Sequence, residues 1–288
     1  MTNNKIVLLT GASRGLGQAA AQIIAARDEP ITLLATSRKA EHLNLTGAHK
    51  DTVIEYPQLD ITDNDSITCL YNDIVDKYGR VDVLINNAGS TFEKIDNSTF
   101  GPEIVKKTFD LNYWGVVKMI EKFTPIIPDG GRIVNVSSAA SQQDDFPNEE
   151  LKARLFDEKT NLVNLNALVE EYMSASKTSD ESDGWLKHGF YPAYSTSKAF
   201  INLLTASSAR NYPTILSNAL AGDLPKGTKA KTPGTRVILR LAFDDIDNVS
   251  GKFWAGKTTA DTGPGDVVED WPGKEIVWDL LPDGASSS

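Results

Sequence analysis

The chain has 288 residues, 40% hydrophobic and 24% charged, which is enough apolar material to bury a sizeable core. Its 29 lysine and arginine residues against 39 aspartate and glutamate residues give a net charge of −10, which argues against a nucleic-acid or anionic-membrane partner. One cysteine, Cys69, excludes an internal disulfide and suits a reducing, cytoplasmic compartment; with three histidines it forms no usual metal cluster. Neither a signal-peptide pattern nor an apolar run of the roughly 18 residues that span a membrane is present.

Short apolar runs alternate with amphipathic stretches through the first two-thirds of the chain. The runs are rich in Val, Ile and Leu and are bounded by turn residues, which predicts buried strands. Between them the apolar residues recur at helical spacing, and Asp63 is a candidate cap for the helix that follows it. This alternation predicts a doubly wound α/β fold with a parallel sheet. The predicted strands are residues 6–9, 31–36, 52–59, 81–86, 132–137 and 215–220, and a helix is predicted over 191–211.

The rhythm breaks at about residues 141–187. This stretch is polar and acidic, and its leucines, with Val169 and Tyr172, fall at roughly helical spacing. We interpret it as a helical insert whose apolar stripe is buried against a neighbouring helix. The predicted organisation is a single domain over 1–282 with this insert, followed by a flexible tail over 283–288.

A glycine-rich segment, Thr10-Gly11-Ala12-Ser13-Arg14-Gly15-Leu16-Gly17, follows the first predicted strand and opens a helix. In a doubly wound fold this is where the backbone N–H groups of a helix N-terminus meet a pyrophosphate. The spacing is Gly-x-x-x-Gly-x-Gly rather than the common dinucleotide fingerprint, so a tight turn without a ligand remains the alternative.

The second predicted strand ends in Thr36-Ser37-Arg38-Lys39, without the acidic residue that would accept a hydrogen bond from the 2′-hydroxyl of NAD. Arg38, with Arg14 from the glycine segment, suits the 2′-phosphate of NADPH. One charge-assisted contact of about 1.5–3 kcal/mol is worth a tenfold or larger preference. The alternative is that Arg38 is a solvated surface charge.

Tyr194 and Lys198 lie four residues apart in the predicted helix 191–211, so they share one face. An ammonium group beside a tyrosine stabilises the phenolate, which makes the tyrosine a better proton donor. The pair alone is a weak signal, because Tyr-x-x-x-Lys is frequent on helix surfaces. It gains weight from Asn86-Asn87-Ala88-Gly89 and Val136-Ser137-Ser138, which end two predicted strands, and from Asn112 between them.

Taken together, these motifs resemble the short-chain dehydrogenase/reductase family over about the first 200 residues. The resemblance implies a Rossmann fold and assigns Tyr194 as general acid/base. Ser138, with Ser137 the less favoured choice, would hydrogen-bond the substrate carbonyl. Lys198 would bind the nicotinamide ribose and lower the tyrosine pKa, and Asn112 would hold a water that links Lys198 to solvent. The implied cofactor-binding set is Gly11, Ser13, Arg14, Gly15, Leu16, Gly17, Ser37, Arg38, Asp60, Ile61, Asn87, Ala88, Gly89, Tyr194, Lys198 and Gly222.

Ser138 and Tyr194 are 56 positions apart, which leaves room for the insert. With Arg14, Arg38 and the segment 250–254, the insert resembles monomeric NADPH-dependent carbonyl reductases, in which it covers a helix face used elsewhere for oligomerisation; the resemblance implies a monomer. After the predicted strand 215–220 the family commonly has Pro-Gly, whereas this chain has Ala221-Gly222-Asp223.

The sequence therefore predicts a cytoplasmic NADPH-dependent reductase of ketones or aldehydes that acts on a small-molecule carbonyl substrate, with neither a metal nor a nucleic-acid or membrane partner. Two alternatives stay open. One is a pteridine-type reductase resembling sepiapterin reductase, or another alcohol dehydrogenase of the family. The other is a non-catalytic NADPH-responsive binding protein, since a fold does not fix a function.

Overall fold

The sheet is the centre of the molecule in this computed structural model. The structure describes residues 4–94, 99–141, 146, 148–157, 159–178, 180, 182–189, 191–222, 233–255 and 265–267. Eight strands pair in the order β3-β2-β1-β4-β5-β6-β7-β8. All neighbours are parallel except β7 and β8, which are antiparallel. The strands are β1 (Lys5–Leu9), β2 (Ile31–Ala35), β3 (Val53–Glu55), β4 (Val83–Asn86), β5 (Arg132–Ser137), β6 (Leu216–Ala221), β7 (Phe253–Ala255) and β8 (Asp266–Val267).

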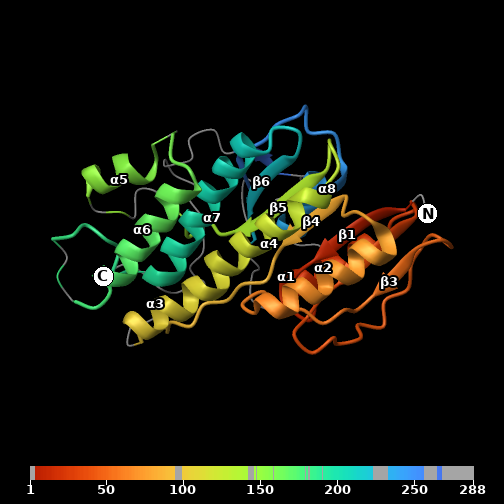
Figure 1. Cartoon of the computed structure of the whole chain (residues 1–288), viewed down its shortest axis with the longest axis horizontal. Helices are drawn as coiled ribbons and strands as arrows, with labels where there is room; N and C mark the ends of the chain where they lie inside the picture. Colours follow the sequence, from red (N-terminus) through yellow and green to blue (C-terminus); the bar gives the residue numbers. More distant parts are fainter. Residues whose placement is uncertain are drawn as a thin grey trace, which may run out of the picture.

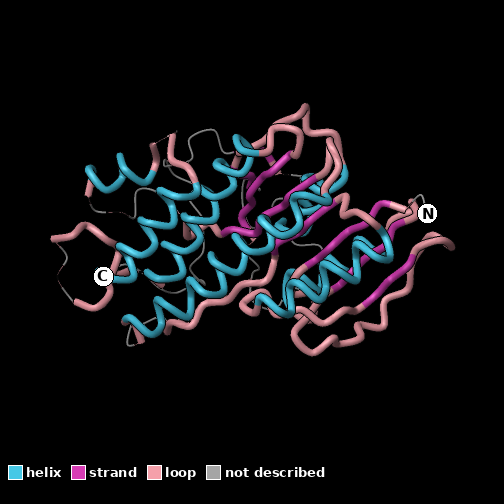
Figure 2. The backbone as a smooth tube through the Cα atoms, in the orientation of Figure 1, coloured by secondary structure: helices cyan, strands magenta, loops and turns pink. Residues whose placement is uncertain are grey.

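The predicted doubly wound fold is confirmed. Strand order reverses at β1, which lies between β2 and β4, so a crevice opens at the carboxyl ends of these strands. Helices cover both faces, as Figures 1 and 2 show. The helical segments are α1 (Gly15–Ala25), α2 (Asn64–Tyr78), α3 (Pro102–Phe109), a π-helical turn (Asp110–Trp114), α4 (Gly115–Phe123), a 3-10 turn (Thr124–Ile126), α5 (Glu149–Leu155), α6 (Leu162–Ala175), α7 (Pro192–Asn211) and α8 (Pro233–Phe243).

Two apolar cores sit on the two faces of the sheet. One lies under α1 and α8, where residues such as Leu16, Ile24 and Leu241 meet the sheet. The other lies under α2, α4 and α7 and extends to the insert. Asp63 caps α2 as predicted, since its carboxylate accepts a hydrogen bond from the Asp65 N–H at 2.9 Å.

The predicted strand 52–59 is too long, because β3 contains only Val53–Glu55. It is an edge strand that pairs only with β2, and Pro57 has no N–H to donate to a ladder. The chain beyond it is held by a single bridge between Ser37 and Gln58. Sequence reasoning did not assign α8 or the short strands β7 and β8.

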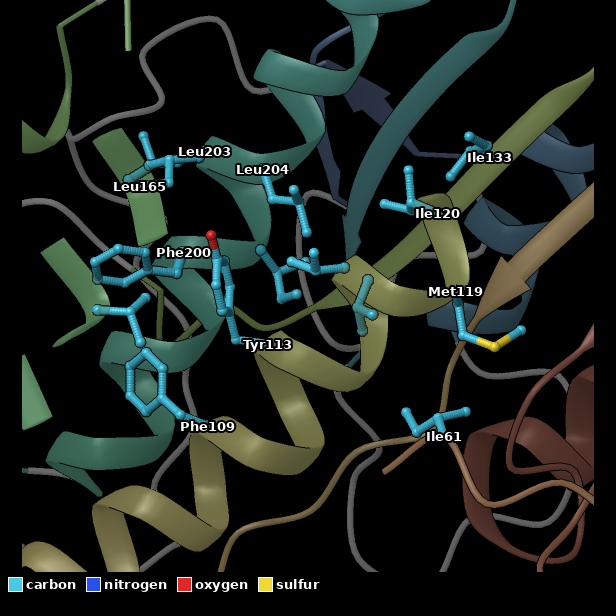
Figure 3. Packing of buried hydrophobic residues seen from close by; sticks show 14 of the residues in the cluster. Ile61, Phe109, Tyr113, Met119, Ile120, Ile133, Leu165, Phe200, Leu203 and Leu204 are labelled. Atoms are coloured by element: carbon cyan, nitrogen blue, oxygen red, sulfur yellow. The ribbon is translucent and has the colours of Figure 1, made fainter. Parts of the chain in front are cut away.

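The insert packs as predicted. Its helices α5 and α6 lie on the opposite side of the molecule from β3, with α6 beside α7 (Figure 1). Trp185 is fully buried and stacks on Phe200 of α7 with ring centroids 6.3 Å apart. Tyr172 of α6 meets Phe109 of α3 at 5.4 Å. Figure 3 shows Phe109, Phe200 and Leu165 pointing into this shared core, so the insert covers the outer face of α7.

Within the described residues, no helix is both long and apolar enough to cross a membrane. The predicted tail 283–288 and the segment 223–232 after Gly222 lie outside the described residues.

Candidate active site

A cavity of about 690 Å³ opens at the carboxyl ends of β1, β2, β4, β5 and β6. Every residue of the predicted cofactor-binding set lines it. Of the four predicted catalytic residues, Tyr194 and Lys198 line it as well, whereas Asn112 and Ser138 are buried and are not among its lining residues. Its lining residues are Gly11, Ser13, Arg14, Gly15, Leu16, Gly17, Ser37, Arg38, Leu59, Asp60, Ile61, Thr62, Asn87, Ala88, Gly89, Ser90, Thr91, Phe92, Lys107, Asp110, Leu111, Val136, Ser137, Tyr194, Lys198 and Gly222.

The glycine segment makes one wall of the cavity, and its shape depends on two left-handed residues. Gly11 has φ +68° and Gly15 has φ +57°, a region that favours glycine. Arg14 is the N-cap of α1 and makes no side-chain cap hydrogen bond. The first turn of α1 therefore offers its N–H groups to an anion, and the residues present fit the pyrophosphate of a dinucleotide.

A hydrogen-bond network ties the glycine segment to the end of β4. The Thr10 hydroxyl accepts from the N–H groups of Asn87 and Ala88 at 3.0 and 2.9 Å. In return, the Asn87 side-chain amide donates to the carbonyls of Thr10 and Gly11 at 2.9 and 3.1 Å. Asn87 thus lines the cavity, and its amide N–H groups join the end of β4 to the glycine segment; its contact with the cofactor stays a prediction.

The end of β2 contributes a basic residue to the cavity and, unexpectedly, contacts an acidic one. Ser37 and Arg38 line the cavity, and Arg14 lines it from the glycine segment. The sequence indicated no acid at this strand end, but the carboxylate of Glu41 accepts a hydrogen bond from the Ser37 hydroxyl. That bond lowers the pKa of Glu41 below its ordinary value. No pattern in the sequence marks Glu41, because an irregular loop rather than a helix or strand brings it back to Ser37.

Tyr194 and Lys198 lie one turn apart on α7, facing the cavity. Lys198 is 4% exposed, and its Nζ donates to the Val136 carbonyl at 2.7 Å. The same Nζ lies 5.7 Å from the centre of the Tyr194 ring. The buried cation therefore lies beside the Tyr194 ring, and a positive charge near a phenol favours its phenolate form.

Asn112 is buried in the π-helical turn between α3 and α4, a distortion often found at functional sites. Its side chain donates to the Ser90 carbonyl and the Ser197 hydroxyl, both at 3.0 Å, and accepts from the Ser90 N–H at 2.9 Å. A Cβ on Gly89 would lie 3.2 Å from both Asn112 Oδ1 and Lys198 Nζ. The missing side chain of Gly89 thus lets the two groups flank the same point.

The two candidate serines differ in placement. Ser137 lines the cavity, and its hydroxyl donates to the backbone carbonyl of Lys198 at 2.9 Å. Ser138 is 1% exposed, and its hydroxyl accepts from the Ala140 N–H at 3.1 Å. The Ser138 carbonyl also accepts from the Ser141 hydroxyl at 2.6 Å. The neighbouring segment 142–145 is not described, so the role of Ser138 stays a prediction.

Comparison with known proteins agrees with this geometry. The family model for short chain dehydrogenases matches residues 5–148. The chain is 30% identical to "Short-chain dehydrogenase/reductase 1" of Saponaria officinalis over 88% of this chain and 95% of that protein. It is 29% identical to carbonyl reductase (NADPH) 1 of Mus musculus over 88% of this chain and 96% of that protein. Among solved structures, menthone neomenthol reductase from Mentha piperita has a TM-score of 0.72 and 23% identity, with 88% of this chain and 98% of that chain covered.

The sheet topology defines a Rossmann-type fold, and the family match identifies an oxidoreductase of a family that uses nicotinamide cofactors. The chain belongs to the short-chain dehydrogenase family, as predicted from its motifs. Its relatives of known activity are oxidoreductases that act on CH–OH or carbonyl groups, and so is this chain. The solved structure at 23% identity adds support for the fold alone.

Proposed function

We propose that this protein is an NADPH-dependent carbonyl reductase that converts ketones or aldehydes to alcohols, with Tyr194 as the proton donor. The observation that carries the proposal is the placement of Lys198 Nζ beside the Tyr194 ring, inside the cavity that gathers the cofactor-binding residues. The mouse relative, which is a carbonyl reductase that uses NADPH by name, supports the same reaction.

In this mechanism the chain orients the substrate and moves a proton, while the nicotinamide, when bound, supplies the hydride. Residues of the glycine segment and the β4 end would hold the cofactor, with Lys198 at its nicotinamide ribose. The Tyr194 hydroxyl would give its proton to the carbonyl oxygen as charge develops there. Lys198 would stabilise the phenolate left behind. Ser138, or Ser137 from the cavity wall, would hydrogen-bond the same carbonyl oxygen.

The preference for NADPH over NADH is proposed on two arginines. Arg38 lies just after the end of β2 and Arg14 lies in the glycine segment, and both line the cavity that would hold the 2′-phosphate. Glu41 works against this preference, because its carboxylate is bonded to Ser37 at the same place. Two charge-assisted contacts of about 1.5–3 kcal/mol each outweigh one exposed carboxylate, whose interactions water screens.

The test follows the absorbance of NADPH and, separately, of NADH with an activated ketone such as a quinone or an α-keto ester. Consumption of NADPH at least about tenfold faster than of NADH is expected. Arg38→Ala should remove most of this preference, and Glu41→Gln, a matched change at the same strand end, should raise it. Equal use of both cofactors by the wild-type enzyme would refute the proposal that Arg14 and Arg38 select NADPH. Tight NADPH binding without turnover would favour the binding-protein alternative.

We also propose that the enzyme is a cytoplasmic monomer, on the single cysteine and on the insert. α6 and Trp185 pack on α7, and the resemblance to monomeric carbonyl reductases implies that the insert covers a helix face used for oligomerisation in other members. Light scattering after size exclusion should give the mass of one chain, and a dimer mass would refute this part of the proposal.

A further inference from the structure

A buried carboxylate joins the cavity wall to the catalytic helix. Residues 87–92 line the cavity, and Glu93 follows them directly. Glu93 is 7% exposed. Its Oε1 accepts a hydrogen bond from the Ala193 N–H at 3.0 Å, and its Oε2 accepts from the Tyr194 N–H at 2.8 Å. The Glu93 side chain therefore binds the backbone of the proposed proton donor, although the two residues are about a hundred positions apart in the sequence.

The start of α7 requires such an external acceptor. The N-cap residue Tyr191 has φ +48° and makes no side-chain cap hydrogen bond. Pro192 has no N–H, and the first intrahelical donor at this end is Ser195, which bonds to the Tyr191 carbonyl at 2.8 Å. The N–H groups of Ala193 and Tyr194 have no acceptor within the helix, and Glu93 takes both.

This arrangement is costly compared with the caps used elsewhere in the chain. α2 and α6 are capped by their own N-cap side chains, Asp63 and Asn161. Burial raises the pKa of Glu93 above its ordinary value, which shows that the surroundings disfavour the carboxylate in spite of the two N–H donors. The left-handed backbone of Tyr191 differs from the extended backbone of the side-chain caps Asp63 and Asn161. The distinct property of Glu93 is that it fixes α7 against the cavity-lining segment.

We propose that Glu93 is a positioning residue that holds the first turn of α7, and with it Tyr194, in register with the cavity-lining segment 87–92. The inference rests on the proposed reductase function, because it assigns the proton donor to Tyr194. Removal of either hydrogen bond lets the first turn shift, and displacement of a reacting group by about 1 Å can cost on the order of a hundredfold in rate.

Among the titratable groups near Glu93, Glu93 is the one whose charge is expected to change at acidic pH. Tyr172 of α6 interacts with it, and burial raises the pKa of the Tyr172 phenol, so Tyr172 stays neutral. Tyr194 of α7 contacts it through the backbone. Lys94 is the next residue in the chain and is exposed. Because the pKa of Glu93 is raised, acidification protonates it before an ordinary carboxyl, and a protonated oxygen no longer accepts as well.

The experiment compares the wild-type enzyme with E93Q and E93A, and with D82N as a matched control. Asp82 also accepts a backbone N–H, from Ile6 at 2.7 Å, but it precedes β4 at the opposite end of the strands. For the Glu93 variants we expect kcat to fall about ten- to hundredfold while the Kd for NADPH changes less than about twofold. Hydrogen exchange of the amides at 193 and 194 should speed up about tenfold or more. D82N should change neither measurement.

A pH series separates positioning from a merely structural effect. The ratio of wild-type to E93Q activity should shrink as the pH falls through the raised pKa of Glu93, because the wild-type side chain then loses its charge as well. Wild-type kcat in E93Q, or a ratio independent of pH, would overturn the proposal. Absence of turnover in the wild-type enzyme would refute the proposed reductase function instead. In that case the amide exchange rates at 193 and 194 would still test the role of Glu93, and unchanged rates in the Glu93 variants would refute it.

Discussion

Gly17→Ala sets two physical effects against each other. Gly17 lies inside α1, where alanine is intrinsically favoured over glycine by about 1 kcal/mol. A Cβ at this position would lie 2.3 Å from the Gly11 carbonyl oxygen and 2.4 Å from Asn87 Nδ2. Backbone must therefore shift, at about 1–3 kcal/mol for overpacking. Two hydrogen bonds from Asn87 to the glycine segment are also disturbed, at about 1 kcal/mol each.

The clash outweighs the higher helix propensity of alanine, and the free energy of unfolding is expected to fall by about 2–4 kcal/mol. For a chain of this size it corresponds to a fall in Tm of about 4–16 °C, measured by circular dichroism. NADPH affinity should fall at least about tenfold, because the displaced segment lines the cavity. Gly101→Ala is the control, since its Cβ would meet nothing within 4 Å, and it should cost less than about 1 kcal/mol. An unchanged or raised Tm for Gly17→Ala would refute the reasoning.

Three further outcomes are expected. Asn112→Ala removes three hydrogen bonds and should lower the free energy of unfolding, measured in urea, by about 3 kcal/mol. It should also lower kcat, and full activity would contradict the proposed role of Asn112. Trp185→Ala empties a buried site between the insert and α7 and should lower the free energy of unfolding by about 3–5 kcal/mol; a loss under 1 kcal/mol would show that the packing of the insert does not depend on Trp185. A hydrogen bond from Arg154 lowers the pKa of Glu171, so the ion pair stabilises the fold above the unfolded-state pKa of Glu171 and loses this effect as the pH falls through the lowered folded-state pKa. Glu171→Gln should therefore lower the free energy of unfolding by less than about 1 kcal/mol at neutral pH and leave it unchanged in acid. A stability difference that persists in acid would contradict this pH dependence.

Much of the sheet follows from the sequence because its strands are buried on both faces. β5 has the predicted bounds; β1, β2 and β4 differ by one or two residues at one end, and β6 is shifted by one residue. The carboxyl ends of parallel strands converge at one edge, so the glycine segment, Ser37 and Asn87 could be placed in one cavity from their positions alone. Helical spacing predicted that Tyr194 and Lys198 share one face, and the resemblance to the family assigned their roles.

The features that escaped prediction depend on contacts between distant segments. Glu41 and Glu93 act through loops whose paths no periodicity describes, so neither carboxylate stands out in the sequence. The end of β3 is set by Pro57 at a sheet edge, which hydrophobic alternation ignores. Ser137 lines the cavity and Ser138 follows it directly after β5, so the choice between the two serines stays a prediction.

Tyr194 is the proposed proton donor of the reaction. Tyr194→Phe removes the hydroxyl and keeps the ring, and Tyr212→Phe at the far end of α7 is the matched control. In NADPH-consumption assays with a carbonyl substrate, Tyr194→Phe should lower kcat about 10²–10⁴-fold with an unchanged Kd for NADPH, while Tyr212→Phe stays at wild-type activity. Turnover by Tyr194→Phe within a few-fold of wild type would contradict the account.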